Sequence, residues 1–264
     1  MNTIFRYPDT STIDYRTQLP FPHALITGSW DEIALSKCAQ EVDQFSDWDG
    51  EKSFYGSERK RYCSNWSNLP PTVSELISEA SKPKFLHWLE ELTNERCLMA
   101  DPYLRGGGIH SIRRGGFLKV HADFNWHEDL QIYRRINLLL YLNIEWKPSW
   151  KGDLELWRRD LKHCSKRIQP LFNTMVVFTT DDKSFHGHPH PLQSPENVTR
   201  NSLALYYYSA KKPRKNYSFP RIVTDYRPTS GEFVRVDSWI KGYLSNSKFV
   251  KQLRHLIRKK YKAE

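Results

Sequence analysis

The chain has 264 residues, 14% of them aromatic, and no long Gly/Ser-rich or Pro-rich tract divides it, which excludes a disordered protein and favours one globular unit. Lys and Arg number 40 against 30 Asp and Glu, a formal net charge of +10 that favours anionic partners without selecting one. No run is long and apolar enough to span a bilayer, so we expect no transmembrane segment.

The N-terminal part combines one short strand with helices. The weakly alternating stretch 21–27 predicts the strand, and an N-cap signal then opens a helix over about 32–45. Apolar residues at helical spacing predict a second helical region over 72–95, interrupted at Pro83. We expect residues 1–97 to support a sheet formed by the residues that follow.

From residue 98 onward, short strands follow one another, divided by turns. Each run is rich in β-branched and aromatic residues and is bounded by Gly, Pro, Asn or Asp. The runs are GIHSIRR, FLKVHAD, RINLLLYLN, GDLELW, TMVVFTT, KSFHG and RNSLALYYYS. This density predicts an antiparallel sandwich or barrel over residues 98–210. Residues 211–264 follow as a basic extension with one or two amphipathic helices, and the three parts form one integrated domain.

Two potential metal ligands stand two residues apart in GGFLKVHADFNWH. On an extended strand His121 and Asp123 share a face, with their Cα atoms roughly 6.6 Å apart. His186, in SFHGHPH, lies far enough along the chain to return on a neighbouring strand. Two histidines and one carboxylate leave about three coordination positions open, which suits non-haem Fe(II).

Other histidines allow a different interpretation. His127, His188 and His190 are competing ligands, and HGHPH could form a zinc-binding cluster. A kink at Pro189 favours loop positions for the later histidines, because a closed structural zinc site usually takes four ligands. A chance HxD triplet with purely structural histidines is the third reading.

The strand RNSLALYYYS carries a candidate carboxylate receptor. Read with period two, Arg200 and Ser202 share a face with Ala204 and Tyr206. Arginine can bind a carboxylate through two hydrogen bonds and serine adds a donor, while the small Ala204 leaves room behind them.

A second wall is predicted by RINLLLYLN. Arg135, Asn137, Leu139 and Tyr141 share one of its faces. If that face lines the barrel, Tyr141 can donate to the same carboxylate, and Asn137 can serve the groups on the metal side. The alternative for Tyr141 is a core aromatic whose hydroxyl bonds to the backbone.

Taken together, GGFLKVHADFN, RRINLLLYLN, GDLELW, SFHGHP and RNSLALYYYS resemble the Fe(II)- and 2-oxoglutarate-dependent oxygenases, in their prolyl 4-hydroxylase-like branch. The resemblance covers roughly residues 105–210. It implies a double-stranded β-helix, a jelly-roll or cupin-like barrel of mainly β class with flanking helices (α+β). The iron ligands and catalytic centre that it implies are His121, Asp123 and His186, and the 2-oxoglutarate-binding residues are Arg200, Ser202 and Tyr141. We expect Asn137 to be a further cofactor-binding residue.

The resemblance also implies the reaction. Fe(II), 2-oxoglutarate and O₂ would take part, 2-oxoglutarate would leave as succinate and CO₂, and a C–H bond would be hydroxylated. Relatives that halogenate carry a small residue in place of the carboxylate, so Asp123 favours hydroxylation.

Two departures from the family bear on the substrate. His110, Ser111 and Arg113 stand where several prolyl hydroxylases have a tyrosine near the cosubstrate, which disfavours peptidyl proline. The stretch between His186 and Arg200 is longer and proline-rich, which predicts a loop beside the entrance.

We therefore expect a small-molecule, carrier-linked or glycan-precursor substrate, with a peptidyl (prolyl-type) hydroxylase as the alternative. Arg113, Arg114 and Arg135 could supply positive charge to an acidic ligand. A non-catalytic barrel that binds an anionic partner is a third hypothesis, but no recognised RNA-binding motif is present, so no nucleic acid is expected. The sequence supports no prediction of the oligomeric state.

The 4 cysteines are widely spaced and form no CxxC pair, which argues against a zinc ribbon or a dense disulfide framework. The stretch MNTIFRYPDTSTIDY lacks the pattern of a secretory signal. We expect reduced thiols and a cytoplasmic location.

Overall fold

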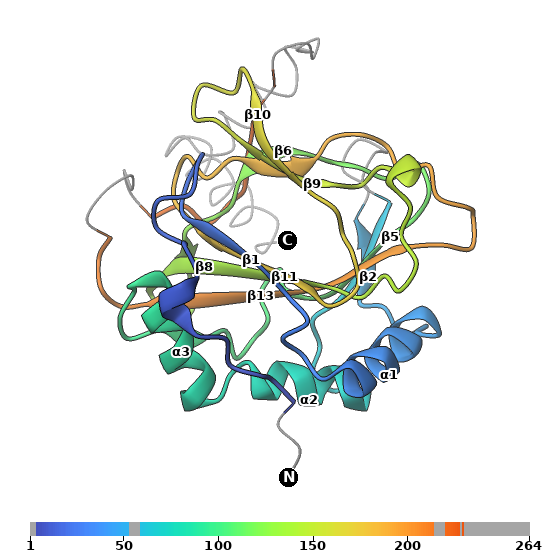
Figure 1. Ribbon diagram of the computed structural model, residues 1–264, viewed down its shortest axis with the longest axis horizontal. Helices are drawn as coiled ribbons and strands as arrows, with labels where there is room; N and C mark the ends of the chain where they lie inside the picture. Colours follow the sequence, from blue (N-terminus) through green and yellow to red (C-terminus); the bar gives the residue numbers. More distant parts are fainter. Residues whose placement is uncertain (1–3, 53–58, 214–219, 228, 230–264) are drawn as a thin grey trace, which may run out of the picture.

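A computed structural model describes residues 4–52, 59–213, 220–227 and 229. Two antiparallel sheets face each other, and the helices pack against the outer side of the larger sheet (Figure 1). This arrangement agrees with the predicted mainly β class with flanking helices and with the predicted barrel. Among the described residues no helix is long and apolar enough to cross a membrane.

The larger sheet holds the long central strands. Its path runs through β1 (His23–Thr27), β11 (Thr174–Thr179), β8 (Ile132–Tyr141), β13 (Arg200–Ser209), β5 (Gly108–Ile112), β3 (Lys60–Cys63) and β2 (Gly50–Lys52). Two short strands lie off this path: β4 (Met99–Ala100) pairs with β13, and β7 (Trp126–His127) pairs with β8.

The smaller sheet has five strands. Their spatial order is β10 (Cys164–Ile168), β9 (Leu154–Trp157), β12 (His186–His188), β6 (Leu118–Ala122) and β14 (Asp225–Tyr226). In Figure 1 this sheet lies above the larger one, on the side away from the helices. The chain crosses between the two sheets several times, because β6, β9 and β12 alternate in sequence with β5, β8, β11 and β13.

The helices form where the residue spacing predicts them. They are α1 (Glu32–Asp43), α2 (Pro71–Glu79) and α3 (Pro83–Thr93), with single 3₁₀ turns at Thr10–Thr12 and Pro148–Trp150. The Asp31 side chain caps α1 by accepting a hydrogen bond from Ala34 N at 3.0 Å. Both α2 and α3 begin with proline. Proline has no backbone N–H, and at a helix start that N–H would have no partner within the helix, so no hydrogen bond is lost. The break predicted at Pro83 is therefore the start of α3.

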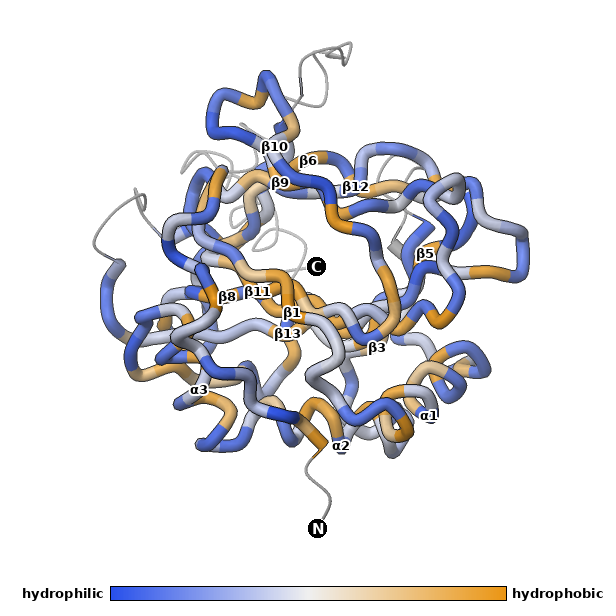
Figure 2. The backbone as a smooth tube through the Cα atoms, viewed as in Figure 1, coloured by the Kyte–Doolittle hydropathy of each residue, from blue (hydrophilic) through white to orange (hydrophobic). Residues whose placement is uncertain are grey.

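The side chains of the central strands separate into two layers. On β8, β11 and β13 one face joins the helices in the main core, which includes Leu138, Val177 and Leu205. The opposite face points into the barrel, where Tyr141 and Val176 pack with Leu154 and Leu156 of the smaller sheet. Both faces are buried, so the apolar residues continue along β8 and β11 (Figure 2).

Several short strands lie outside the runs that the sequence predicts, namely β2, β3, β4, β7, β10 and β14. His186 was expected to end a strand, but it begins β12. The four cysteines are free thiols, as expected. The predicted C-terminal helices fall within 230–264, outside the described residues.

Candidate metal centre and carboxylate receptor

The structure brings His121, Asp123 and His186 together at one point of the barrel interior. His121 lies on β6 and His186 directly opposite it on β12, with ring centroids 4.4 Å apart. Asp123 follows β6 immediately. One ligand atom from each of the three side chains lies within 4.8 Å of the others, and no other such cluster occurs in the described part of the chain. All three residues are buried.

The backbone orients both imidazole rings. Nδ1 of His121 lies 2.8 Å from the carbonyl of Lys119, and Nδ1 of His186 lies 2.9 Å from that of Ser184. Each Nδ1 therefore carries the proton that it donates, which leaves the lone pair of Nε2 for a metal. The Nε2 atoms lie 3.5 and 3.4 Å from the carboxylate oxygens of Asp123, as expected for ligands that converge on one ion.

The carboxylate of Asp123 is held from its other side. Its Oδ2 accepts hydrogen bonds from Nδ2 of Asn137 at 2.6 Å and from Nη2 of Arg134 at 3.1 Å. Oδ1 of Asn137 in turn accepts from Nε of Arg134 at 2.7 Å and from Oγ1 of Thr180 at 3.0 Å. These bonds fix the plane of the carboxylate. Asn137 thus acts on the metal side of the site.

The local charges set the protonation states that a metal requires. Burial raises the pKa of Asp123, but Arg134, His186 and His121 outweigh it, so that this pKa lies well below its usual range. Burial and the neighbouring His121 lower the pKa of His186 to about 4. At neutral pH the cluster therefore offers an anionic carboxylate and a neutral imidazole, the forms that bind metal ions.

Arg134 is a site residue that the sequence does not reveal. Its side chain is fully buried, and its guanidinium carbon lies 3.4 Å from the ring centroid of Tyr206 and 4.6 Å from that of Phe124. The neighbouring Arg135 was expected to face the interior with Asn137, and that expectation is wrong. Arg135 instead forms an ion pair with Glu95, with an N–O distance of 2.6 Å.

A β-bulge explains the exchange of the two arginines. The register of β8 against β13 shifts, so that Ile136 lies opposite Tyr207 whereas Arg134 lies opposite Tyr208. Arg135 is the extra residue between them, and the strict alternation that places Asn137, Leu139 and Tyr141 on one face ends there.

The predicted carboxylate receptor forms at the start of β13. Nε of Arg200 donates to the carbonyl of Gly152 at 2.8 Å, and its Nη2 donates to the Tyr141 hydroxyl at 3.2 Å. Ser202 pairs with Tyr141 across the two strands, so that all three side chains share the inner face. Burial raises the pKa of Tyr141, although Arg200 opposes the shift, so its phenol keeps a proton to donate. A buried arginine with two hydroxyls is suited to bind a carboxylate.

The other candidate histidines do not join the metal cluster. Nε2 of His127 lies 3.4 Å from Asp101, and Nε2 of the exposed His190 lies 3.4 Å from Glu155. The HGHPH zinc cluster is therefore not formed. His188 differs from both, because its imidazole is buried inside the barrel; burial, then Arg200, Lys60 and His121 lower its pKa well below the usual range.

The predicted sources of charge at the rim are occupied. Arg113 lies 3.6 Å from Glu51, and Arg114 lies 3.3 Å from Glu196 while it donates to the carbonyl of Ser194. With Arg135 paired to Glu95, each of the three arginines has a carboxylate neighbour of its own. None of them is reserved for an acidic ligand.

The segment after residue 219 also reaches the metal cluster. β14 pairs with β6 so that Tyr226 lies opposite His121, with ring centroids 5.3 Å apart. Nη2 of Arg221 donates to the carbonyl of Asp123 at 2.6 Å. Sequence reasoning missed this segment, because a strand of two residues has no periodicity.

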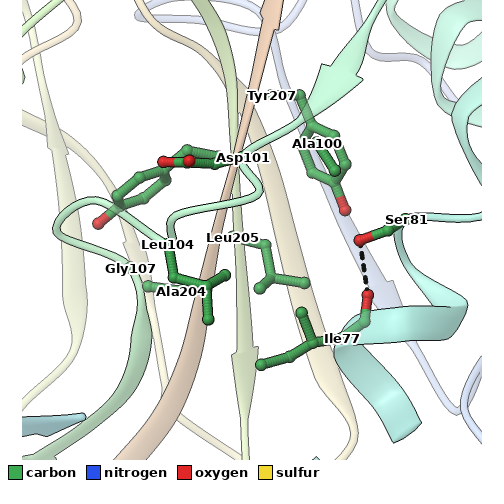
Figure 3. A pocket seen from close by; sticks show the side chains of 10 residues that line it. Ile77, Ser81, Ala100, Asp101, Leu104, Gly107, Ala204, Leu205 and Tyr207 are labelled. Carbon is green, nitrogen blue, oxygen red and sulfur yellow. Dashed lines mark hydrogen bonds between the residues drawn. The ribbon is translucent and has the colours of Figure 1, made fainter. Parts of the chain in front are cut away.

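A small separate pocket lies on the helix side of β13 (Figure 3). Ile77 and Ser81, from α2 and the turn after it, line it together with Leu205 and Tyr207. Ala204 and Tyr206 also line it, but none of the three residues of the metal cluster does, and neither do Arg200, Ser202 and Tyr141.

Comparison with protein families gives one match. Residues 107–208 match the model of the 2OG-Fe(II) oxygenase superfamily, a range that contains the metal cluster and the carboxylate receptor. No curated protein matches the chain.

Many solved structures have a similar fold, and three of them are described in this paragraph. A prolyl 4-hydroxylase structure from Phytophthora capsici has a TM-score of 0.53 and 16% identity, over 79% of this chain and 63% of that chain. A prolyl-4-hydroxylase from Pseudomonas putida has a TM-score of 0.47 and 13% identity, over 78% of this chain and 96% of that chain. HygX from Streptomyces hygroscopicus, with nickel, 2-oxoglutarate and hygromycin B bound, has a TM-score of 0.48 and 12% identity, over 76% of this chain and 93% of that chain. The Phytophthora likeness supports the double-stranded β-helix, although this chain spans only 63% of that one.

Proposed function

Because residues 107–208 match the model of the 2OG-Fe(II) oxygenase superfamily, we propose that the protein is an Fe(II)- and 2-oxoglutarate-dependent dioxygenase that hydroxylates a C–H bond. His121, Asp123 and His186 would hold the iron, and Arg200, Tyr141 and Ser202 the distal carboxylate of 2-oxoglutarate. One observation carries the proposal: a buried His/Asp/His cluster and a buried arginine line the same barrel. Three ligands on one side of an ion leave positions for cosubstrate and O₂.

The side chains supply position and protonation. When bound, Fe(II) activates O₂ with electrons from 2-oxoglutarate, which leaves as succinate and CO₂. Arg134 and Asn137 engage Oδ2 of Asp123 and so fix the orientation of the carboxylate that would hold the iron. The apolar lining, which includes Leu156 and Phe178, excludes water from the reacting atoms.

For the substrate we propose a small molecule, free or carrier-linked, or a glycan precursor. A peptide is the alternative. The paired state of Arg113, Arg114 and Arg135 removes the reason to expect a strongly acidic substrate. His110, Ser111 and Arg113 stand where several prolyl hydroxylases have a tyrosine near the cosubstrate, which supports a substrate other than peptidyl proline.

Succinate formation tests the proposal. The protein is loaded with Fe(II) without oxygen, then mixed with 2-oxoglutarate and O₂, and succinate is measured by chromatography. We expect turnover that falls to background in His121→Ala and Asp123→Ala. In Arg200→Ala the affinity for 2-oxoglutarate should fall about 10- to 100-fold.

His190→Ala is the matched control, since this histidine is exposed and lies near the cluster in sequence. It should retain full turnover. A wild-type protein that neither forms succinate nor binds 2-oxoglutarate would refute the proposal. Comparing small metabolites with peptides as stimulants of succinate release then separates the two substrate classes.

A further inference from the structure

The imidazole of His188 is a buried polar group without a visible function. The residue is 3% exposed, and neither Nδ1 nor Nε2 has a hydrogen-bond partner. Nearly all buried polar atoms in folded proteins have a partner, because an unpaired one costs about 1–3 kcal/mol. A ring with both nitrogens unpaired therefore indicates a ligand that supplies the partner.

The strand geometry places this ring between the two parts of the site. His188 lies two residues after His186 on β12, so that both point into the barrel. On the facing sheet, Arg200 and Lys60 both pair with Ile112 and share its face. The charged groups that lower the pKa of His188 are Arg200, Lys60 and His121, in that order. The ring thus lies within electrostatic range of both the carboxylate receptor and the metal cluster.

His188 does not belong to the metal cluster itself. The group whose ligand atoms lie within 4.8 Å of one another contains only His121, Asp123 and His186. A role as a fourth ligand is therefore not supported. A neutral imidazole has one N–H donor, and a carboxylate offers several acceptor positions.

We propose that His188 binds the dicarboxylate together with Arg200, by donating a hydrogen bond to the distal carboxylate. This inference rests on the proposed function, because it takes 2-oxoglutarate as the ligand. It supplies the hydrogen-bond partner that this buried ring does not find within the protein. The free-energy cost of burying this ring is then offset only when the anion is bound. His188 would thus contribute to the affinity and the selectivity for the cosubstrate.

Calorimetry with two ligands tests the inference. The protein is loaded with Mn(II), which avoids turnover, and titrated with 2-oxoglutarate or with 2-oxopentanoate, which has the same chain length but no distal carboxylate. His188→Leu removes the donor, while His188→Asn and His188→Gln keep an amide N–H near the positions of Nδ1 and Nε2. His190→Leu is the matched control, since its side chain is 62% exposed.

We expect His188→Leu to raise the Kd of 2-oxoglutarate about 10- to 100-fold, as for a lost hydrogen bond to a charged group. The Kd of 2-oxopentanoate and of Mn(II) should stay within about threefold, and one of the two amide variants should restore part of the loss. His190→Leu should match the wild type.

The other outcomes overturn the inference in distinguishable ways. If the wild type binds 2-oxoglutarate and His188→Leu binds it equally well, the inference fails and the proposed function stands. If His188→Leu weakens both ligands equally, the assignment to the distal carboxylate fails. If the wild type binds neither ligand, the proposed function fails and this inference with it.

Discussion

Asp123 lies against His121 and His186 on one side and a buried guanidinium on the other. Arg134 has no exposed surface, and the rings of Phe124 and Tyr206 lie along its guanidinium. Removing one partner from such a pair leaves a buried charge uncompensated, which costs about 3–5 kcal/mol. The same guanidinium holds down the pKa of Asp123. Arg134 therefore positions the carboxylate of Asp123, the candidate metal ligand.

Replacing Arg134 with methionine should weaken metal binding and stability together. We expect the affinity for Mn(II) to fall about 10- to 100-fold, as for other groups that orient a metal ligand. The free energy of unfolding should fall by about 3–5 kcal/mol. Both are measured on the purified variant, by calorimetry and by urea denaturation.

Arg135→Met provides the control for this prediction, because Arg135 is adjacent in sequence but pairs with Glu95 outside the barrel. It should lower stability by about 1 kcal/mol and leave metal affinity unchanged. Equal losses of metal affinity in the two variants would contradict the assignment of Arg134.

The ligand cluster was predictable from the sequence, whereas Arg134 and His188 were not. His121 and Asp123 share a strand face by simple alternation, and Arg200 and Ser202 do the same. Arg134 faces inward only because of the bulge at Arg135, and two adjacent arginines carry no signal that tells them apart. His188 was assigned to a loop because of Pro189, but β12 extends through it.

At the level of elements, β5 connects the receptor strand β13 to β3. Gly108 begins β5 with φ +85°, a conformation that favours glycine, and a Cβ there would clash with the carbonyl oxygen of Cys63 on β3. Opposite Gly108 on β13 lies Ala204, on the same face of the strand as Arg200 and Ser202. Close packing of three backbones at this point thus sets the position of that face.

Substitution of Gly108 by alanine should therefore destabilise the sheet. The backbone strain and the displacement of β3 together should cost about 2–5 kcal/mol. Gly28→Ala is the control, because Gly28 also has a positive φ, +67°, but a Cβ there would meet nothing within 4 Å. It should cost only about 1–2 kcal/mol. Equal losses in urea denaturation would show that the contact with Cys63 does not matter.

Long alternating elements were predictable, and short polar ones were not. The predicted runs contain β11 and β13 entirely and β8 from Arg135 onward, because these strands bury both faces and are rich in apolar residues; β8 begins three residues earlier, at Ile132. β3 (KRYC) and β10 (CSKRI) are short and polar, and they form strands only because a neighbour offers an open edge.

On the scale of the whole molecule, the site joins the two sheets. The metal ligands lie on and directly after strands of the smaller sheet, whereas Arg200, Tyr141 and Ser202 belong to the larger one. A ligand that touches both groups binds the folded barrel and not the unfolded chain. Its binding energy therefore adds to the stability of the fold.

Metal and 2-oxoglutarate together should raise the melting temperature more than either alone. At a ligand concentration of 100 times Kd, the expected stabilisation is about 2.7 kcal/mol. Thermal melting in a chelator, in Mn(II), and in Mn(II) with 2-oxoglutarate measures it. Asp123→Ala should show no shift with Mn(II). A wild-type melting temperature that none of these additions changes would contradict a ligand that bridges the sheets.

The pairing of β14 with β6 has a consequence for dissecting this protein. The oxygenase domain match ends at residue 208, yet the strand that carries His121 has β14 as its outer neighbour. A fragment that ends at residue 208 would leave His121 and Ala122 of β6 without this pairing, at an open edge of the kind through which chains associate and aggregate. Self-association of such a fragment would then report the loss of that cover, and would be no evidence about the native protein's assembly.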